Sequence, residues 1–247
     1  MKKVNAQAGL RTEVIGYKHG DTVLEGHLAY DDAVKGNRPG VIVVHAWTGL
    51  DAYTKSRTEQ LAKLGYVAFA IDMYGKGVKA KDAEEAARLA GIYRADRRLM
   101  RSRANAGLEV LKKHALTDAK RIAAIGYCFG GGVALELARS GADIAGVVSF
   151  HGNLDTPNPE DAKNIRGKVL ILHGAADPIV PTDQVIAFQD EMRKANVDWQ
   201  MAIYGGAVHA FTNPESGHDP SRGAAYNEKA DRRSWEAMET FFAEIFE

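Results

Sequence analysis

The chain has 247 residues, 32 basic and 32 acidic side chains, and a hydrophobic content of 45%. This length suits one domain, which we expect to span residues 1–247. The cancelling charges give no reason to expect a nucleic acid or an anionic membrane as a partner, and no apolar run approaches the roughly 20 residues of a transmembrane helix. Lys2 and Lys3 are not followed by the apolar core of a secretory signal, and one cysteine excludes an intramolecular disulfide framework, so we expect a cytoplasmic protein.

The first half of the chain alternates β-branched runs with helical patterns. Two antiparallel strands are expected around the turn at 19–21, and the Val-Ile-Val-Val run at 41–44 is typical of a central strand buried on both faces. We expect strands at residues 12–17, 22–30, 41–44 and 66–72, and helices at residues 52–64, 82–89 and 93–113. The last of these helices carries five arginines (94, 97, 98, 101 and 103), which we interpret as mostly a solvated face.

The second half continues the alternation. We expect strands at residues 121–125, 146–150, 168–172 and 199–204, and helices at residues 132–139, 182–194 and 231–246. The final helix is amphipathic and should bury Trp235, Met238, Phe241 and Phe242. This order predicts an α/β fold, a doubly wound, mostly parallel sheet with helices on both faces, in which ligands bind at the carboxyl ends of the strands.

The Gly-Tyr-Cys-Phe-Gly-Gly stretch at 126–131 lies between an expected strand and an expected helix. Strand, Gly-x-nucleophile-x-Gly and helix make a nucleophile elbow, here with Cys128 where Ser is usual. A side chain at Gly126 or Gly130 would collide with the neighbouring strand or helix. The alternative is a buried, unreactive cysteine in a glycine-rich turn.

An acid and a base follow in chain order, each after an expected strand. Asp177 follows the strand at 168–172, and His209 follows the strand at 199–204. Nucleophile, acid, base is the α/β-hydrolase order, so we predict a Cys128–Asp177–His209 triad. His209 would deprotonate the thiol, and Asp177 would fix the imidazole tautomer. Alternatively, Asp177 is a turn or capping acid, and six other histidines (19, 27, 114, 151, 173 and 218) compete for the role of base.

The oxyanion hole should use two main-chain N–H groups. One is that of Phe129, the residue after the nucleophile, and we expect the other at Trp47, in the loop after the strand at 41–44. The Trp47 side chain could equally be an aromatic lid or a core anchor, since the donor is main chain.

With these motifs, the sequence resembles the dienelactone hydrolase (carboxymethylenebutenolidase-like) family of α/β-hydrolases. The resemblance covers nearly the whole chain and is carried by residues 41–49, 72–75, 126–131, 172–174 with Asp177, and 205–211. It implies hydrolysis of an activated lactone or carboxylic ester, a small molecule, through a thioester and without a metal or an organic cofactor.

Two positions depart from the family pattern. Ala46 stands where family members commonly carry Glu, a carboxylate thought to keep the resting thiol protonated, so Cys128 here should pair with His209 and oxidise more readily. Asn213 stands about where dienelactone-specific members carry an Arg that binds the substrate carboxylate. Tyr93 matches their substrate-pocket Tyr, and Arg88, about one turn before it, is near their other Arg.

These departures leave other functions open beside a lactone or ester hydrolase. One is a broad-specificity short-chain carboxylesterase without a carboxylate-binding group. Another is a non-catalytic ligand-binding or thiol redox-sensing protein on the same scaffold, for which Ala46 is the argument. A monomer and a homodimer are both compatible with the sequence.

Overall fold

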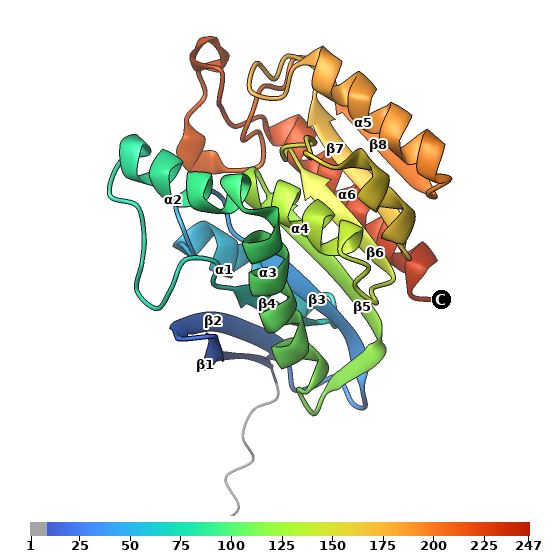
Figure 1. Ribbon diagram of the computed structural model, residues 1–247. Coiled ribbons are helices and arrows are strands. Elements are labelled where there is room, and N and C mark those ends of the chain that lie inside the picture. The colour runs from blue at the N-terminus through green and yellow to red at the C-terminus, as the bar shows by residue number, and fades with distance from the viewer. Residues whose placement is uncertain (1–8) are drawn as a thin grey trace, which may run out of the picture.

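In the computed structural model, which describes residues 9–247, eight strands form one sheet in the order β1-β2-β4-β3-β5-β6-β7-β8 (Figure 1). The strands are β1 (Leu10–His19), β2 (Thr22–Asp31), β3 (Arg38–Val44), β4 (Val67–Ile71), β5 (Thr117–Tyr127), β6 (Gly146–Phe150), β7 (Lys168–Gly174) and β8 (Trp199–Tyr204). β2 pairs antiparallel with β1 and with β4, and the pairs from β4 to β8 are all parallel. The expected mostly parallel α/β sheet is confirmed.

Helices cover both faces of this sheet. They are α1 (Ala52–Lys63), α2 (Ala83–Ala95), α3 (Arg97–Lys112), α4 (Phe129–Arg139), α5 (Thr182–Ala195) and α6 (Glu228–Ile245). Helices α3, α4 and α5 lie in front of the sheet in Figure 1, and α1 and α6 lie behind it. Within the described chain, no helix has the length and apolar character needed to cross a membrane.

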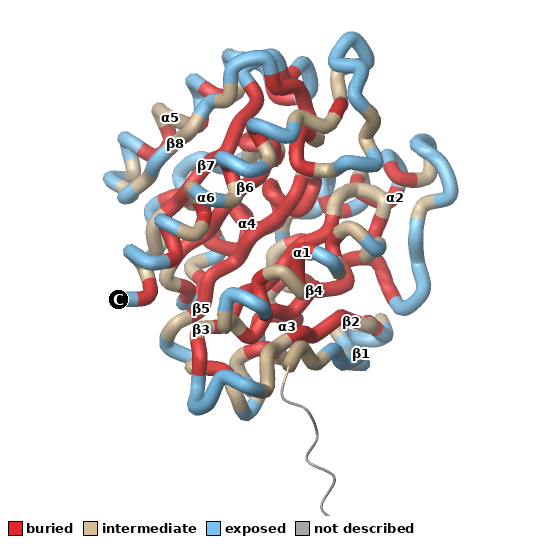
Figure 2. Tube along the Cα trace, turned by 180° about the vertical axis from the view of Figure 1, so that it is seen from behind, coloured by how far each residue is buried: buried red, intermediate tan, exposed pale blue. Residues whose placement is uncertain are grey.

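The run at 41–44 shows why this sheet needs helices on both sides. Val41 and Val43 pack into the core beneath α1 and α6, whereas Ile42 and Val44 pack into the core beneath α3, α4 and α5. All four side chains are fully buried, as expected for alternate residues of a strand covered on both faces. The central strands are correspondingly buried over most of their length in Figure 2, apart from the first part of β5.

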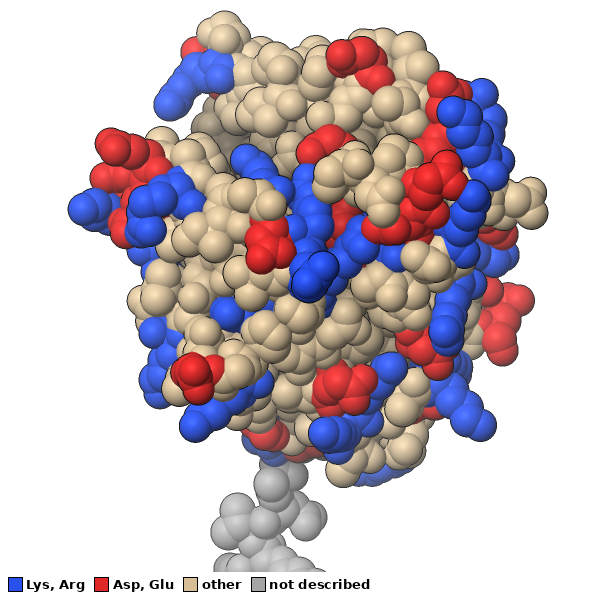
Figure 3. Space-filling view, in the orientation of Figure 1, with Lys and Arg blue, Asp and Glu red and all other residues tan. Residues whose placement is uncertain are grey.

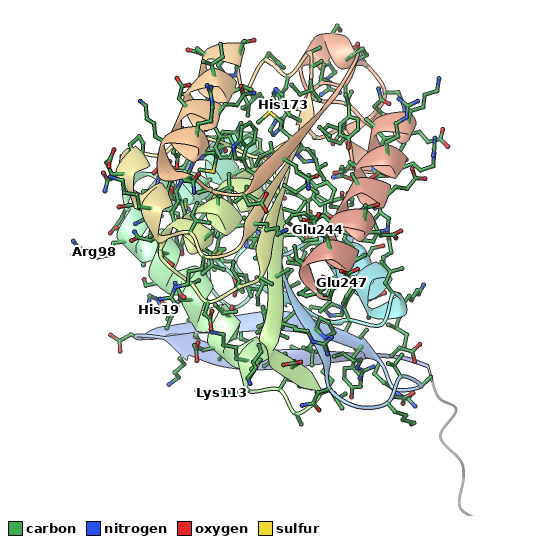
Figure 4. All side chains as sticks on the ribbon, turned by 90° about the vertical axis from the view of Figure 1, so that its right-hand side faces the viewer. His19, Arg98, Lys113, His173, Glu244 and Glu247 are labelled. Atoms are coloured by element: carbon green, nitrogen blue, oxygen red, sulfur yellow. The ribbon has the colours of Figure 1, made fainter. Side chains whose placement is uncertain are left out.

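The parallel strands end together at one edge of the sheet, and the loops that follow them are neighbours. His173 near the end of β7 marks this carboxyl edge in Figure 4, and Lys113, which precedes β5, marks the opposite edge. Ligands of such sheets bind at the carboxyl edge.

Several boundaries differ from the sequence expectation. Asp96 ends α2, and its carboxylate accepts a hydrogen bond from the Leu99 N–H to cap α3, so Tyr93 belongs to α2 and not to the next helix. Helix α6 begins at Glu228 because Asn227 caps it, three residues before the expected start. Its Trp235 is half-buried rather than buried, with the Arg57 guanidinium 5.2 Å from the ring.

Three further boundaries also shifted. Strand β5 runs from 117 to 127, longer than the expected 121–125. Helix α4 already begins at Phe129, before its run of glycines, and α2 reaches Ala95 rather than ending at 89.

The expected solvated arginine face is only partly correct, because Arg94 and Arg98 are exposed and the other three arginines have partners. Arg97 pairs with Asp155 at 2.8 Å, Arg101 pairs with Glu136 at 2.7 Å, and Arg103 is buried, where it donates to the Met73 carbonyl at 3.0 Å. Arg98 does point outward (Figure 4). Basic and acidic groups therefore intermingle over this face in Figure 3, with no extended basic surface.

Candidate active site

Cys128 lies on the turn between β5 and α4, with φ 55° and ψ −118°. A positive φ is unusual for a residue with a side chain and is held here by tight packing. A Cβ on Gly126 would lie 1.9 Å from the Gly130 carbonyl oxygen, and a Cβ on Gly130 would lie 2.3 Å from the Val44 carbonyl oxygen. The expectation that both glycines are required by close backbone contact is confirmed.

Asp177 and His209 meet beside this turn. The Asp177 Oδ2 atom lies 2.8 Å from His209 Nδ1, and both side chains are almost completely buried. The other carboxylate oxygen, Oδ1, accepts from the N–H groups of Ile179 and Val180 at 2.8 and 3.2 Å. The carboxylate is therefore fixed by its own loop, with one oxygen left for the imidazole.

The main chain of His209 is also fixed. Its N–H donates to the Gly223 carbonyl at 3.2 Å, and its carbonyl accepts from the Ala225 N–H at 3.0 Å. The long loop after β8 therefore folds back to support the histidine, and one of its turns, Pro220–Arg222, directly precedes Gly223.

Cys128 and His209 shift each other's pKa through electrostatic interaction. Burial raises the pKa of the Cys128 thiol, but the His209 charge, a hydrogen bond with His209 and the Phe129 N–H outweigh it and leave that pKa below its ordinary value. Burial lowers the pKa of His209, but the thiolate and Asp177 together raise it to about 10. His209 Nε2 is buried without a nitrogen or oxygen partner within residues 9–247, which leaves it to the thiol. Both shifts favour a thiolate–imidazolium pair.

A cavity of about 410 Å³ opens over this pair. Its wall includes Ala46, Trp47, Cys128, His209 and Asn213. Ala46 and Asn213, the two positions that depart from the family pattern, therefore both border the cavity over Cys128. The volume is in the range of small-molecule sites.

The two expected oxyanion donors lie on adjacent loops. The Phe129 N–H interacts with the Cys128 sulfur and helps to lower its pKa. The Trp47 side chain borders the cavity, and its N–H donates to no other group among the described residues. Trp47 is half-buried: it packs against the core beneath α3, α4 and α5 and also borders the cavity.

The expected substrate contacts are not brought to the cavity. Tyr93 is 5% exposed and packs behind Phe129 and Tyr74, with ring centroids 6.2 and 5.7 Å away. Arg88 is exposed on α2, pairs with Glu85 and lines a separate surface hollow.

Arg94 borders the cavity instead, and it is also exposed, as the sequence pattern predicted. Its Nη2 atom donates to Asn153 Oδ1 at 2.9 Å, and its guanidinium lies 6.0 Å from the Phe129 ring centroid. The Arg94 charge contributes to the lowered pKa of Cys128. Its place at the last turn of α2, near the carboxyl edge of the sheet, could have been found only with the correct helix limit.

Among the competing histidines, His151 also borders the cavity. Its ring centroid lies 5.2 Å from that of His209, and its Nε2 lies 2.8 Å from Thr212 Oγ1. Burial holds the pKa of His151 well below its ordinary value, and within residues 9–247 no carboxylate bonds to this ring as Asp177 bonds to His209. Elsewhere, His19 bonds to Arg103 and His27 to Glu59, away from the cavity.

Among the described residues, no set of three or more His, Cys, Asp or Glu side chains is arranged to hold a metal ion.

The mostly parallel eight-stranded sheet, its helices and the strand–turn–helix elbow define an α/β-hydrolase. The fold of MGS-M1, an α/β hydrolase from a deep-sea metagenome library, agrees, with a TM-score of 0.72 at 18% identity. The sequence model of the dienelactone hydrolase family matches residues 24–246. The chain belongs to the dienelactone hydrolase family, and it is a hydrolase.

Individual relatives are similar to this chain over most of their length. The solved structure of m3DLH is 41% identical with a TM-score of 0.93, covering 97% of this chain and 100% of that one. P91, described as a dienelactone hydrolase-like promiscuous phosphotriesterase from metagenomic libraries, is 39% identical with a TM-score of 0.91, over 97% and 100% of the two chains. A Bradyrhizobium protein named "Probable 2-oxo-3-(5-oxofuran-2-ylidene)propanoate lactonase" is 31% identical, over 76% of this chain and 79% of its own.

Proposed function

We propose that this hydrolase cleaves a lactone or carboxylic ester with Cys128 as nucleophile, His209 as acid–base and Asp177 as its partner. The observation that carries the proposal is the buried, 2.8 Å contact of Asp177 with His209 Nδ1, which leaves Nε2 to the thiol. The single cysteine remains the argument for a reducing, cytoplasmic compartment.

In the first half of the reaction, the Cys128 thiolate attacks the carbonyl carbon of a substrate held in the cavity. The carbonyl oxygen gains the negative charge and accepts from the main-chain N–H groups of Trp47 and Phe129. The C–O bond to the leaving alkoxide then breaks as imidazolium His209 protonates that oxygen. A lactone opens here into a thioester whose new hydroxyl stays in the same molecule.

In the second half, neutral His209 takes a proton from water, which attacks the thioester carbonyl. The second tetrahedral intermediate uses the same two N–H groups, and its collapse returns the thiolate and releases a carboxylic acid. Asp177 stabilises the imidazolium in both halves and keeps its proton on Nδ1 when the ring is neutral.

Trapping the thioester tests this proposal directly. His209→Ala keeps the nucleophile but removes the base, so incubation with p-nitrophenyl acetate should leave an acetyl group on Cys128, detected by mass spectrometry. Cys128→Ala should lose about 10³-fold or more in turnover. His218→Ala, at an exposed histidine whose ring centroid lies 5.8 Å from that of Tyr226, is the control and should behave as wild type. Turnover of Cys128→Ala within tenfold of wild type would rule out this nucleophile.

Arg94 leads us to expect that the enzyme prefers substrates with an anionic group. Among the described residues, Arg94 is the guanidinium that borders the cavity, and its charge helps to lower the pKa of Cys128. Asn213 offers no charge, and the cavity wall also carries the acidic residues Asp51 and Glu215. An ester or lactone with one anionic group directed toward Arg94 should therefore be preferred. If acidic and neutral lactones react equally well, the broad short-chain carboxylesterase is the better description.

A second candidate reaction is phosphotriester hydrolysis, because P91 at 39% identity is described as a promiscuous phosphotriesterase. In this reaction the thiolate attacks phosphorus while the N–H groups bind the phosphoryl oxygen, and the P–O bond to the aryloxide or alkoxide breaks as His209 protonates the leaving oxygen. Water then attacks phosphorus, which returns the Cys128 thiolate and releases a phosphodiester. Paraoxon turnover, compared between wild type and Cys128→Ala, tests this reaction. If wild type turns over none of these substrates, the ligand-binding or redox-sensing alternative gains support, and oligomeric state can be measured on the same samples by light scattering.

A further inference from the structure

His45 is a fully buried histidine directly after β3 that takes no part in the proposed reaction. It does not line the cavity, and it packs instead behind the cavity wall. Its ring centroid lies 4.9 Å from that of Tyr74 and 6.3 Å from that of Phe129. A polar ring in such a place requires partners for both nitrogens.

Both nitrogens have main-chain partners, and these fix the tautomer. Nε2 lies 3.2 Å from the Met73 nitrogen, whose N–H can only donate, so Nε2 is the unprotonated acceptor. Nδ1 lies 2.6 Å from the Ala46 carbonyl oxygen, which can only accept, so Nδ1 carries the proton. Burial also lowers the pKa of His45, which keeps the ring neutral.

The Ala46 carbonyl belongs to the same peptide group as the Trp47 N–H. It accepts from His45 and also from the Gly49 N–H at 3.2 Å. A carbonyl that accepts hydrogen bonds polarises its amide, which makes the N–H of that amide a stronger donor. The two donors also hold the peptide plane, and so the direction in which the Trp47 N–H points.

The following peptide is held in the same way. The Tyr74 hydroxyl donates to the Trp47 carbonyl at 2.8 Å, and the Asp72 carboxylate fixes the turn that carries Tyr74 by accepting from its N–H at 2.9 Å. The start of α4, which carries the Phe129 N–H, is packed closely against the same loop, since Gly130 contacts the Val44 and His45 carbonyls. The loop therefore cannot shift relative to the start of α4 without breaking these contacts.

We propose that His45 is a positioning residue, whose donation to the Ala46 carbonyl orients and polarises the Ala46–Trp47 peptide so that the Trp47 N–H binds the oxyanion. This inference rests on the proposed Cys128 mechanism. His45 touches no substrate, so its effect falls on the transition state and on kcat rather than on KM.

Two substitutions separate the roles of the two nitrogens. The side-chain amide of Asn reaches the position of Nδ1, so His45→Asn can still donate to Ala46. The amide of Gln reaches the position of Nε2, so His45→Gln can accept from Met73 but loses the bond to Ala46. His114→Gln, at a half-buried histidine whose Nδ1 accepts from the Leu116 N–H, is the matched control.

Two reactions of Cys128 then distinguish positioning from general damage. Acylation by p-nitrophenyl acetate passes through an oxyanion, whereas alkylation by iodoacetamide does not. We expect His45→Gln to lower kcat and the acylation rate by about tenfold to 100-fold, less than loss of a whole oxyanion donor, with KM and alkylation unchanged. His45→Asn should recover most of the acylation rate, and the control should match wild type.

The proposal is overturned if acylation by His45→Gln stays within twofold of wild type, if alkylation falls in proportion, or if His45→Asn is no better than His45→Gln. Nitrogen-15 NMR of the wild-type imidazoles covers the case in which the variants do not fold. A neutral ring protonated on Nδ1 is expected, and a His45 ring protonated on Nε2 or titrating between pH 6 and 8 also refutes the proposal. If instead Cys128→Ala retains activity, the mechanism itself fails whatever the His45 variants do.

Discussion

Replacing Asp177 by Asn tests the proposed acid with almost no change in shape. The Oδ1 side must still accept from the N–H groups of Ile179 and Val180, so the new amide NH₂ has to face His209. His209 Nδ1 can then only accept, and the ring proton moves to Nε2. That nitrogen can no longer take a proton from the Cys128 thiol.

The expected loss follows from the burial of the pair. A hydrogen bond to a charged group is worth about 1.5–3 kcal/mol, which is roughly tenfold to 150-fold in rate at about 1.4 kcal/mol per tenfold. The wrong tautomer adds to this loss, and the serine triad sets an upper limit of about 10⁴-fold. Because a thiolate needs less help from a base than an alkoxide does, we expect Asp177→Asn to lower kcat/KM by about 10²- to 10³-fold.

The assay combines turnover of p-nitrophenyl acetate with the pH dependence of iodoacetamide alkylation. The lowered pKa of Cys128 means that the wild-type thiolate persists below pH 9 and is lost as the pH falls through the folded-state pKa. Asp177→Asn should move this midpoint upward, because the imidazolium loses its partner. Asp190→Asn, on the surface of α5, is the control. If kcat/KM of Asp177→Asn stays within tenfold of wild type and the pH midpoint of alkylation does not shift, Asp177 does not support His209 as the base.

Three other substitutions follow from the same site. Ala46→Glu places a carboxylate in the wall of the Cys128 cavity, so the alkylation midpoint should rise and inactivation by dilute peroxide should slow; an unchanged or lowered midpoint contradicts this. Arg94→Gln should raise KM for an acidic lactone by about tenfold or more and leave neutral p-nitrophenyl acetate unaffected, and equal effects on both would exclude anion recognition. Gly126→Ala forces its Cβ to within 1.9 Å of the Gly130 carbonyl, so the thermal midpoint should fall far more than for Gly16→Ala, whose Cβ meets nothing within 4 Å.

The sequence could predict those parts of the site that depend on local pattern. A β-branched run followed by a glycine-flanked turn is readable without any tertiary contact, and so Cys128 and its strand were found. Asp177 and His209 were found because parallel strands bring the loops after them to one edge. The contact between Asp177 and His209, and the lowered pKa of the Cys128 thiol, could not be predicted from the sequence because both depend on distances between separate loops.

The proposed substrate contact of Arg94 could not be predicted from the sequence, because it depends on a helix limit. Asp96 serves both as the end of α2 and as the cap of α3, and a single Asp inside a long helical pattern is a weak signal. Missing it placed Tyr93 at the start of a helix and hid Arg94. His45 was missed for another reason, since its partner Met73 lies 28 residues further along the chain.

The backbone at Cys128 has a consequence for stability. Its φ of 55° and ψ of −118° belong to a region that glycine populates freely and that other residues occupy at a cost of about 1–3 kcal/mol. An inactive Cys128→Gly variant should therefore melt above Cys128→Ala, by roughly 2–4 °C for each kcal/mol of strain relieved in a chain of this size. Glycine would fit this backbone conformation with less strain than cysteine does, but glycine has no thiol. The strain at position 128 therefore lowers stability, and in the proposed mechanism it is the cost of placing a reactive thiol at this turn.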